Sequence, residues 1–382
     1  MARKKKDAPV AGKMSIDQIR GMINKHAGCE VAFDMREENP SDVSAWIPTG
    51  SRWLDGIVCL GKMAGIPVGR ISEIAGEPSS GKSYMALQIA INAQKMGMDV
   101  VYFDSESAMS TDFCKAAGID FDKFIYLQAT SLEFVFEIIE QILAQSNTQT
   151  LFILDSLANC PTLSEIEDGN YNPKADMAPL ARVSSKGMKK LVSPIANHKS
   201  TFLVLNQLKT KINTVNPAMT KYDPWFTPGG MATTYSYSLR IWLTRRAGIK
   251  HQVEDENGFR VGSHMKCKLK KNRFGCENRE CEMRINWGAN GVFIHDRESW
   301  LEAIAGSPHY SGGQWKSITM EDGTEMKFQN ATWLDKLEND QKFYDRAIQI
   351  LDEQLIDRFA RREGSAKAYY SIDGDEDGGK KE

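Results

Sequence analysis

The sequence contains no long apolar run. Nothing in its 382 residues approaches the roughly 18 consecutive apolar residues that a membrane-spanning helix requires. The basic start, residues 1–6, is followed by no apolar segment, which argues against a secretory signal peptide. The seven cysteines are scattered and odd in number, which favours free thiols in a reducing compartment over a disulfide framework. These absences predict a cytoplasmic protein with no membrane partner.

The chain also has little net charge, -2 at pH 7, so its overall electrostatic field favours neither nucleic acid nor a membrane surface. Any DNA-binding site must therefore be a local patch. Cys267, Cys276 and Cys281 lie close together in the sequence, but no CxxC pair accompanies them, and we expect thiols rather than a zinc site.

Composition divides the chain into four expected regions. Residues 1–45 form an N-terminal arm with an oligomerisation helix, residues 46–298 a core, residues 299–365 a small C-terminal domain, and residues 366–382 a disordered acidic tail. The helix is predicted by the capping-box spacing of Ser15 and Gln18 and by an apolar face of Ile16, Ile19, Met22 and Ile23. A lone helix this short needs a partner, either in the same chain or in a neighbouring subunit.

The core alternates short apolar runs with helical stretches, which predicts an α/β fold with a mostly parallel sheet and helices on both faces. Strands are expected over 71–75, 100–104, 151–155 and 201–207, with helices from Lys82, Leu132 and Met177. Closely spaced strands near 239–243, 265–271, 281–287 and 292–295 predict an antiparallel extension. In the C-terminal α+β domain, a helix is expected over 340–360.

A phosphate-binding motif is the strongest signal. The pattern GxxxxGK[ST] lies between a predicted strand and a predicted helix and consists of Gly76, Glu77, Pro78, Ser79, Ser80, Gly81, Lys82 and Ser83. Small residues let the backbone wrap the phosphates of a nucleotide such as ATP, and the helix N-terminus faces the negative charge. Lys82 would reach the β and γ phosphates, and the Ser83 hydroxyl would bind Mg²⁺.

Two acids follow apolar strands, and we expect the ends of these strands to lie at the same edge of the sheet as the motif. Asp155 ends the run 151–154, where α/β sheets place ligands, and would also hold Mg²⁺. Glu106 follows the strand 100–104 and can orient and deprotonate the water that attacks the γ phosphate. A helix cap for Asp155 and a solvated turn carboxylate for Glu106 are the alternatives.

The segment from Gln207 to Tyr235 shows no periodicity, and so long a gap inside a domain is usually functional or disordered. Its cations and aromatic rings suit single-stranded DNA, and the candidate DNA-binding residues are Lys209, Lys211, Lys221, Tyr222, Trp225, Phe226, Gly229 and Gly230. In the acidic loop 161–176, only the part from Tyr171 to Lys174 is expected to contribute. For the segment after Gln207, an ordinary surface loop is the alternative.

Basic residues also alternate along the expected strand near 265–271. Lys271 and Arg273 share one face and could project toward a phosphate, although a solvated basic edge strand would show the same pattern.

Together these residues resemble the RecA recombinase family, which includes UvsX-like phage recombinases. The resembling segments occur in the family's order and approximate spacing: 69–83, 103–106, 154–156, 206–207, 227–230 and 271–273. The resemblance covers about residues 14–300 and is looser over 307–356.

The resemblance implies a DNA-dependent ATPase that uses ATP and Mg²⁺, forms a helical filament on single-stranded DNA and exchanges strands with a homologous duplex. It implies that Glu106 is the catalytic base and that Gln207 senses the γ phosphate, while Lys271 and Arg273 reach the neighbouring subunit's ATP. A single-strand-binding protein and a mediator are expected partners.

The chain departs from the family pattern at Ser110, which stands where an acid lies near the adenine, and at Glu77-Pro78, whose order is reversed. Arg273 replaces a lysine, which keeps the charge but changes its geometry. A hexameric helicase with the same core fold and a nucleotide-gated mediator without turnover are the alternative functions.

Overall fold

The computed structural model describes residues 14–37, 39, 41–167, 179–211, 224–246, 252–254, 257–287 and 294–360. Tyr171, Lys174, Lys221, Tyr222 and the expected acidic tail lie outside the described residues. The chain divides into two compact units, Met1–Ser44 and Ala45–Glu382. Among the helices of the described part, none has the length and apolar character needed to cross a membrane.

The first unit contains helix α1 (Ile16–Ala27), and its predicted capping box is confirmed. The Ser15 hydroxyl accepts from the Gln18 amide at 3.2 Å, and the Ser15 amide donates to the Gln18 side chain at 2.9 Å. The helix ends at Gly28, whose φ of 70° is the left-handed cap conformation. Ile16, Met22 and Ile23 remain exposed, so this unit does not cover the apolar face of α1.

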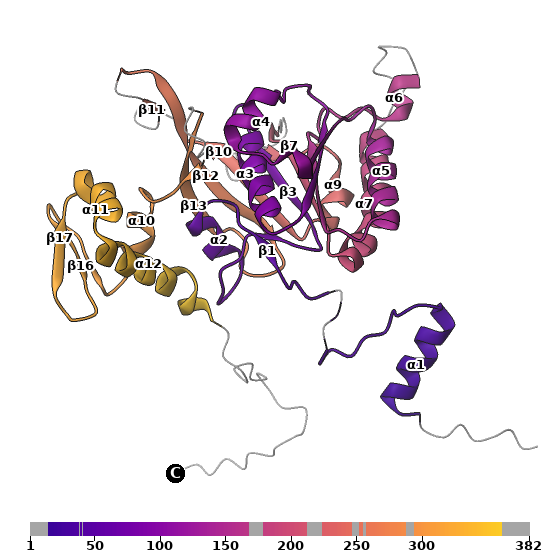
Figure 1. Cartoon of the computed structure of the whole chain (residues 1–382), viewed down its shortest axis with the longest axis horizontal. Coiled ribbons are helices and arrows are strands. Elements are labelled where there is room, and N and C mark those ends of the chain that lie inside the picture. Colours follow the sequence, from indigo (N-terminus) through magenta and orange to yellow (C-terminus); the bar gives the residue numbers. More distant parts are fainter. Residues whose placement is uncertain are drawn as a thin grey trace, which may run out of the picture. The chain divides into compact units, whose positions relative to one another are not determined.

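The second unit is built on a ten-stranded sheet (Figure 1). Six strands are parallel, in the order β10-β3-β7-β6-β4-β5. Their bounds are β3 (Ile71–Gly76), β4 (Asp99–Asp104), β5 (Phe124–Gln128), β6 (Thr150–Asp155), β7 (Thr201–Gln207) and β10 (Leu239–Arg245). The predicted strands at 71–75, 100–104, 151–155 and 201–207 are thus confirmed.

Alternate residues of the parallel strands enter two different hydrophobic clusters. In β6, Leu151 and Ile153 belong to one cluster, and Phe152 and Leu154 belong to the other. Helices α3 (Lys82–Lys95) and α4 (Thr111–Ala117) contribute to the first cluster, and α5 (Leu132–Gln145) and α7 (Pro179–His198) contribute to the second. Helices therefore cover both faces of the sheet, as predicted.

The antiparallel extension consists of β12 (Arg260–Asn272), β13 (Glu280–Asn286) and β14 (Ile294–His295), with β11 (Gln252–Glu254) paired to β12. The expectation for 239–243 is corrected in one respect. β10 runs parallel to β3, and the antiparallel part begins where β12 pairs with β10.

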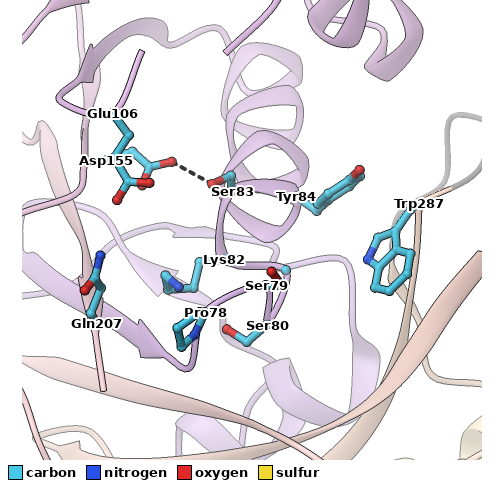
Figure 2. A pocket seen from close by; sticks show the side chains of 11 residues that line it. Pro78, Ser79, Ser80, Lys82, Ser83, Tyr84, Glu106, Asp155, Gln207 and Trp287 are labelled. Carbon is cyan, nitrogen blue, oxygen red and sulfur yellow. Dashed lines mark hydrogen bonds between the residues drawn. The ribbon is translucent and has the colours of Figure 1, made fainter. Parts of the chain in front are cut away.

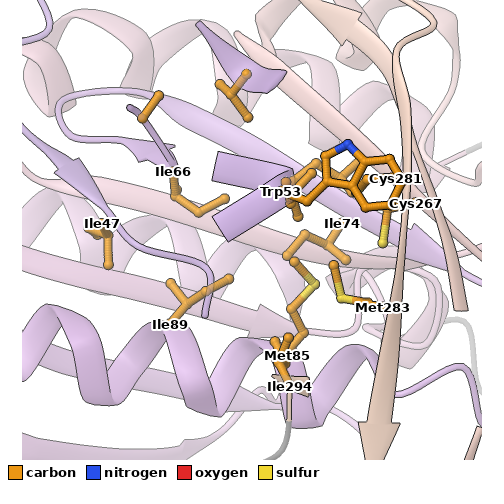
Figure 3. Packing of buried hydrophobic residues seen from close by; sticks show 14 of the residues in the cluster. Ile47, Trp53, Ile66, Ile74, Met85, Ile89, Cys267, Cys281, Met283 and Ile294 are labelled. Carbon is orange, nitrogen blue, oxygen red and sulfur yellow. The ribbon is translucent and has the colours of Figure 1, made fainter. Parts of the chain in front are cut away.

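The C-terminal region packs on the core through one continuous hydrophobic cluster, part of which Figure 3 shows. The region comprises α10 (Trp300–Ile304), β15 (Tyr310–Ser311), β16 (Lys316–Thr319), β17 (Glu325–Phe328), η3 (Asn330–Thr332), α11 (Trp333–Asn339), α12 (Gln341–Leu355) and η4 (Asp357–Phe359). Helix α12 is therefore shorter than the expected 340–360. Arg52 of α2 (Arg52–Val58) forms two hydrogen bonds to the Asp352 carboxylate of α12, at 3.1 and 2.6 Å.

The remaining elements are short: β1 (Trp46–Ile47), β2 (Ile66–Pro67), η1 (Phe121–Lys123), α6 (Leu163–Glu167), β8 (Lys209–Thr210), β9 (Trp225–Phe226) and α9 (Met231–Ser236).

Candidate functional site

The GxxxxGK[ST] motif forms the turn between β3 and α3, as its spacing predicts. Gly81 is the N-cap of α3 with a φ of 78°. A Cβ at Gly76 would lie 2.2 Å from the Ser80 hydroxyl, and one at Gly81 would lie 2.6 Å from Ile285 Cδ1. The positive φ of Gly81 favours glycine, a side chain at Gly76 would displace Ser80, and the turn leaves the N-terminus of α3 open to an anion.

A cavity of about 570 Å³ opens over this turn (Figure 2). Its lining comes from the ends of β3, β4, β6 and β7 and from the extension, and comprises Pro78, Ser79, Ser80, Gly81, Lys82, Ser83, Tyr84, Glu106, Asp155, Gln207 and Trp287. The structure thus brings together most of the nucleotide-site residues expected from the sequence. Gly76 and Glu77 contribute their carbonyl oxygens, which accept from Lys82 Nζ at 3.3 and 3.0 Å.

Ser83 and Asp155 lie in direct contact at the cavity wall. Asp155 Oδ2 accepts hydrogen bonds from the hydroxyls of Ser83 and Tyr102, both at 2.6 Å. Burial raises the pKa of Asp155, while these two donors oppose the rise. A hydroxyl and a carboxylate are the oxygen donors that Mg²⁺ prefers, so the pair fits that ion. Tyr102 was not expected at this site from the sequence.

Lys82 and Glu106 face the cavity from different elements. Burial lowers the pKa of Lys82, and the nearby carboxylates of Asp155, Glu106 and Glu77 oppose that shift. Glu106 Oε1 accepts from the Ser156 hydroxyl at 2.8 Å and from Asn159 Nδ2 at 2.7 Å. The carboxylate is therefore held in one orientation toward the end of β6.

A second cavity of about 290 Å³ adjoins the first and shares Ser83, Tyr84 and Asp155 with it. Its further lining residues include Met109, Ser110 and Phe113. The Ser110 hydroxyl accepts from the Phe113 amide at 3.2 Å and so caps α4. Ser110 thus lies beside the cavity and is engaged in a local hydrogen bond.

Gln207 ends β7 at the cavity, and the segment after it contains short elements that periodicity did not predict. β8 pairs with β9, and α9 follows Gly230. Trp225 packs against the buried cluster of Ala75, Leu208 and Trp242, whereas the Phe226 side chain is exposed. Of the other candidate DNA-binding residues in this segment, Lys209 and Lys211 are described, whereas Lys221 and Tyr222 lie outside the described residues.

Lys271 and Arg273 do share one face. Lys271 Nζ donates to the carbonyls of Thr234 and Tyr235 at 2.8 and 3.1 Å, and Arg273 Nη2 donates to Tyr235 at 2.7 Å. Burial, followed by the charges of Arg273 and Arg240, lowers the pKa of Lys271 to about 8. Neither cation lines the nucleotide cavity of its own subunit.

A basic groove that was not expected from the sequence lies on α7. It has a volume of about 620 Å³ and is lined by Ala181, Arg182, Ser185, Lys186, Lys189, Lys190 and Ala232. The helical spacing of its cations could have revealed it. Gly230 lies beside it with a φ of 80°, and a Cβ there would come within 2.8 Å of Ala181 Cβ.

Cys267 and Cys281 are buried partners across β12 and β13, and Cys276 is exposed. Among the described residues, no group of three or more His, Cys, Asp and Glu side chains could hold a metal ion.

Comparison with known proteins adds a family match. A model of the RecA N-terminal domain matches residues 14–292. Protein RecA of Ruminococcus albus is 34% identical over 276 residues, which are 72% of this chain and 65% of that protein. Protein RecA of Nautilia profundicola is 34% identical over 266 residues, 70% of this chain and 71% of that protein. The chain therefore matches just under two thirds of the length of the Ruminococcus protein.

Among solved structures, the crystal structure of the RadB recombinase matches with a TM-score of 0.46 and 19% identity. The matched region covers 65% of this chain and 99% of the RadB chain.

Proposed function

The chain belongs to the RecA recombinase family, and on that premise we propose that it is a recombinase that polymerises on single-stranded DNA and hydrolyses ATP. In this proposal it pairs the bound strand with a homologous duplex and exchanges strands, and DNA stimulates hydrolysis. The observation that carries the proposal is the position of Gln207. It lines the nucleotide cavity, and the chain that follows leads to Gly230 beside the basic groove of α7.

In the nucleotide site, the residues 76–83 would surround the phosphates of ATP, and Lys82 would neutralise the terminal ones. Ser83 and Asp155 would hold Mg²⁺, which supplies positive charge beside the β and γ phosphates. Their contact at 2.6 Å on the cavity wall supports this assignment.

Glu106 would act as the general base for the attacking water. Glu106 lines the cavity, and the hydrogen bonds from Ser156 and Asn159 hold its Oε1. Gln207, which also lines the cavity, would sense the terminal phosphate.

The DNA site would combine the α7 groove with Lys209, Lys211, Phe226, Gly229 and Gly230. Arg182, Lys186 and Lys189 of the groove would contact phosphates, whereas Lys190 is paired with Glu140 at 2.7 Å. The exposed Phe226 ring is suited to stacking on a base. Trp225 would serve as an anchor for this segment because it is already packed in a cluster.

Assembly would place Lys271 and Arg273 at the ATP of the neighbouring subunit. A cation supplied in trans can accelerate hydrolysis by roughly 10³ to 10⁵, so turnover would require the filament. The arm within residues 1–45 would join subunits, and a single-strand-binding protein and a mediator would act as partners.

A phosphate-release assay with and without single-stranded DNA tests the function, with Lys82→Ala as the inactive control. We expect DNA to stimulate release, and helical filaments to be visible by electron microscopy with a slowly hydrolysed ATP analogue. Absence of stimulation at saturating ATP would favour a nucleotide-gated mediator. Closed rings that separate a duplex without a homologous partner would favour a helicase.

A further inference from the structure

A buried ion pair lies in the first half of the paired strands β3 and β10. Arg240 Nε donates to Glu73 Oε2 at 2.6 Å, and the Glu73 side chain is fully buried. The two residues are register partners on adjacent parallel strands, so both side chains lie on the same face of the sheet. Neither residue lines the nucleotide cavity or the groove of α7, so the proposed chemistry leaves this pair unused.

Asn206 connects the pair to the nucleotide cavity. Its Nδ2 donates to Glu73 Oε1 at 3.0 Å, and its Oδ1 accepts from the backbone amide of Gln207 at 2.9 Å. Since Gln207 lines the cavity, a displacement of its backbone would disturb a side chain that is already bonded to Glu73.

The same network holds the segment that leads to the groove. Arg240 Nη2 donates to Thr227 Oγ1 at 2.8 Å, and Asn206 Nδ2 also donates to the Pro228 carbonyl at 3.1 Å. Thr227 and Pro228 are therefore fixed from two sides by side chains of the sheet.

Pro228 is followed directly by the glycines that pack on α7. A Cβ at Gly229 would lie 2.9 Å from Leu157 Cδ2, and one at Gly230 would lie 2.8 Å from Ala181 Cβ. The space beside both glycines is therefore filled by neighbouring side chains, so the position of Thr227 and Pro228 sets the position of both glycines beside the groove.

A buried ion pair is weak evidence for stability, because the cost of removing two charges from water can exceed their attraction. What this ion pair contributes here is a fixed geometry of the hydrogen-bond network. Glu73 accepts through both carboxylate oxygens, and Arg240 donates through both Nε and Nη2, so the network has one well-defined arrangement.

We propose that Arg240 is a positioning residue that, with Glu73 and Asn206, couples the nucleotide cavity to the groove of α7 through Thr227. The inference rests on the proposed ATP-dependent binding of single-stranded DNA. It adds the specific contacts by which nucleotide occupancy changes the affinity for DNA.

Thr227→Val tests the coupling, because valine keeps the shape of threonine but cannot accept from Arg240. The affinity for a labelled single-stranded oligonucleotide is measured with and without a slowly hydrolysed ATP analogue. We expect the ratio of the two affinities to fall about tenfold, as the loss of one charge-assisted hydrogen bond predicts. The affinity for the analogue and the nucleotide-free DNA affinity should stay within about twofold of wild type.

Thr244→Val is the matched control, because Thr244 is a half-buried residue of β10 whose hydroxyl is not part of the network, and it should behave as wild type. Arg240→Lys keeps the charge beside Glu73 but loses the planar fork, and it should lower the ratio as well. In the double variant Thr227→Val with Arg240→Lys, the affinity ratio should fall no further than in the more strongly affected single variant.

An unchanged ratio in Thr227→Val, an equal loss of DNA affinity with and without nucleotide, or additive losses in the double variant would overturn the coupling. If Arg240→Lys does not fold, Thr227→Val and its control decide alone. Wild-type protein that binds DNA equally well without nucleotide would instead contradict the proposed function, so the two failures are distinguishable.

Discussion

Lys82 and Glu106 line the same cavity, but they would act at different moments of the reaction. Lys82 would neutralise phosphate charge as soon as a nucleotide binds, whereas Glu106 would contribute only when water attacks. Substitutions at the two positions should therefore separate binding from hydrolysis.

We expect Lys82→Ala to weaken nucleotide binding at least tenfold, and with it the nucleotide-dependent binding of DNA. Glu106→Gln should bind ATP and DNA as wild type does but lower the turnover rate by about 10² to 10⁴, the usual contribution of a general base. Equilibrium binding of a fluorescent ATP analogue and single-turnover hydrolysis measure the two steps. Similar behaviour of both variants would contradict these roles.

Asp55 of α2 is a buried acid remote from this chemistry. It accepts from the Thr49 hydroxyl at 2.7 Å, and nearby Asp296 accepts from Ser51 and Trp53. Burial raises the pKa of Asp55 to about 8; the Thr49 hydrogen bonds oppose the rise, and Asp296 adds to it. The folded protein therefore binds a proton here that the unfolded chain releases near pH 4.

This proton makes stability depend on pH with a definite sign. The stabilising contribution of Asp55 is fully present below about pH 4 and is lost as the pH rises through about 8. Asp55→Asn, which does not titrate, should remove this slope, so the difference in unfolding free energy between pH 5 and pH 8 should shrink by on the order of a few kcal/mol. Urea denaturation at the two pH values measures it, and an unchanged difference would refute the assignment.

The residues of the cavity differ in how far the sequence reveals them. Lys82 and Ser83 belong to one contiguous motif, and Asp155 and Glu106 follow apolar strands, so their chemistry is visible in local sequence. Tyr102 and Trp287 were missed for a physical reason. Tyr102 meets Asp155 only because β4 pairs with β6, and Trp287 reaches the cavity only through the folding of the extension.

At the level of elements, the pairing of α5 and α7 depends on one small residue. A Cβ at Gly187 of α7 would lie 2.2 Å from Cδ2 and Cε2 of Phe136 in α5. The Phe136 ring is buried, so it cannot move aside freely. The two helices can approach this closely only because position 187 lacks a side chain.

Gly187→Ala should therefore destabilise the protein by about 1 to 3 kcal/mol, although alanine is the better helix former by about 1 kcal/mol. Adding Phe136→Leu should recover part of the loss, so the double variant should be more stable than the sum of the single effects predicts. Thermal unfolding measures all three variants, and a stabilising Gly187→Ala would show that the packing is looser than described.

The elements themselves were predictable where burial is continuous. The central parallel strands β4, β6 and β7 are buried along most of their length, and their sequences are short apolar runs. β5 was missed because it is an edge strand with exposed Ile125 and Tyr126. β8, β9 and α9 were missed because strands of two residues and a helix of six are too short for a period to appear.

At the scale of the whole molecule, α1 belongs to a unit of its own and exposes Ile16, Met22 and Ile23. Burying such side chains is worth roughly 1.5 to 3 kcal/mol each, so a partner surface is expected. The proposed assembly of subunits would offer that surface without altering the nucleotide site.

The double variant Ile16→Ser with Ile23→Ser should raise the protein concentration needed for assembly at least tenfold, because two apolar contacts are lost. The affinity of each subunit for an ATP analogue should not change. Analytical ultracentrifugation measures assembly, and Lys25→Ser on the same helix serves as the control. Normal assembly with a less stable subunit would mean that α1 packs on its own chain.

The GxxxxGK[ST] turn follows β3 of the parallel part of the sheet, but Gly81 lies against Ile285 of β13, and Trp287, which follows β13, also lines the cavity. A bound nucleotide would thus touch both halves of the sheet at once and fasten them together. We expect the residence time of the nucleotide to depend on how often the antiparallel extension separates from the GxxxxGK[ST] turn. The stiffness of strands β12 and β13, which carry no proposed catalytic group in the cavity, would then help to set the rate of each round of hydrolysis.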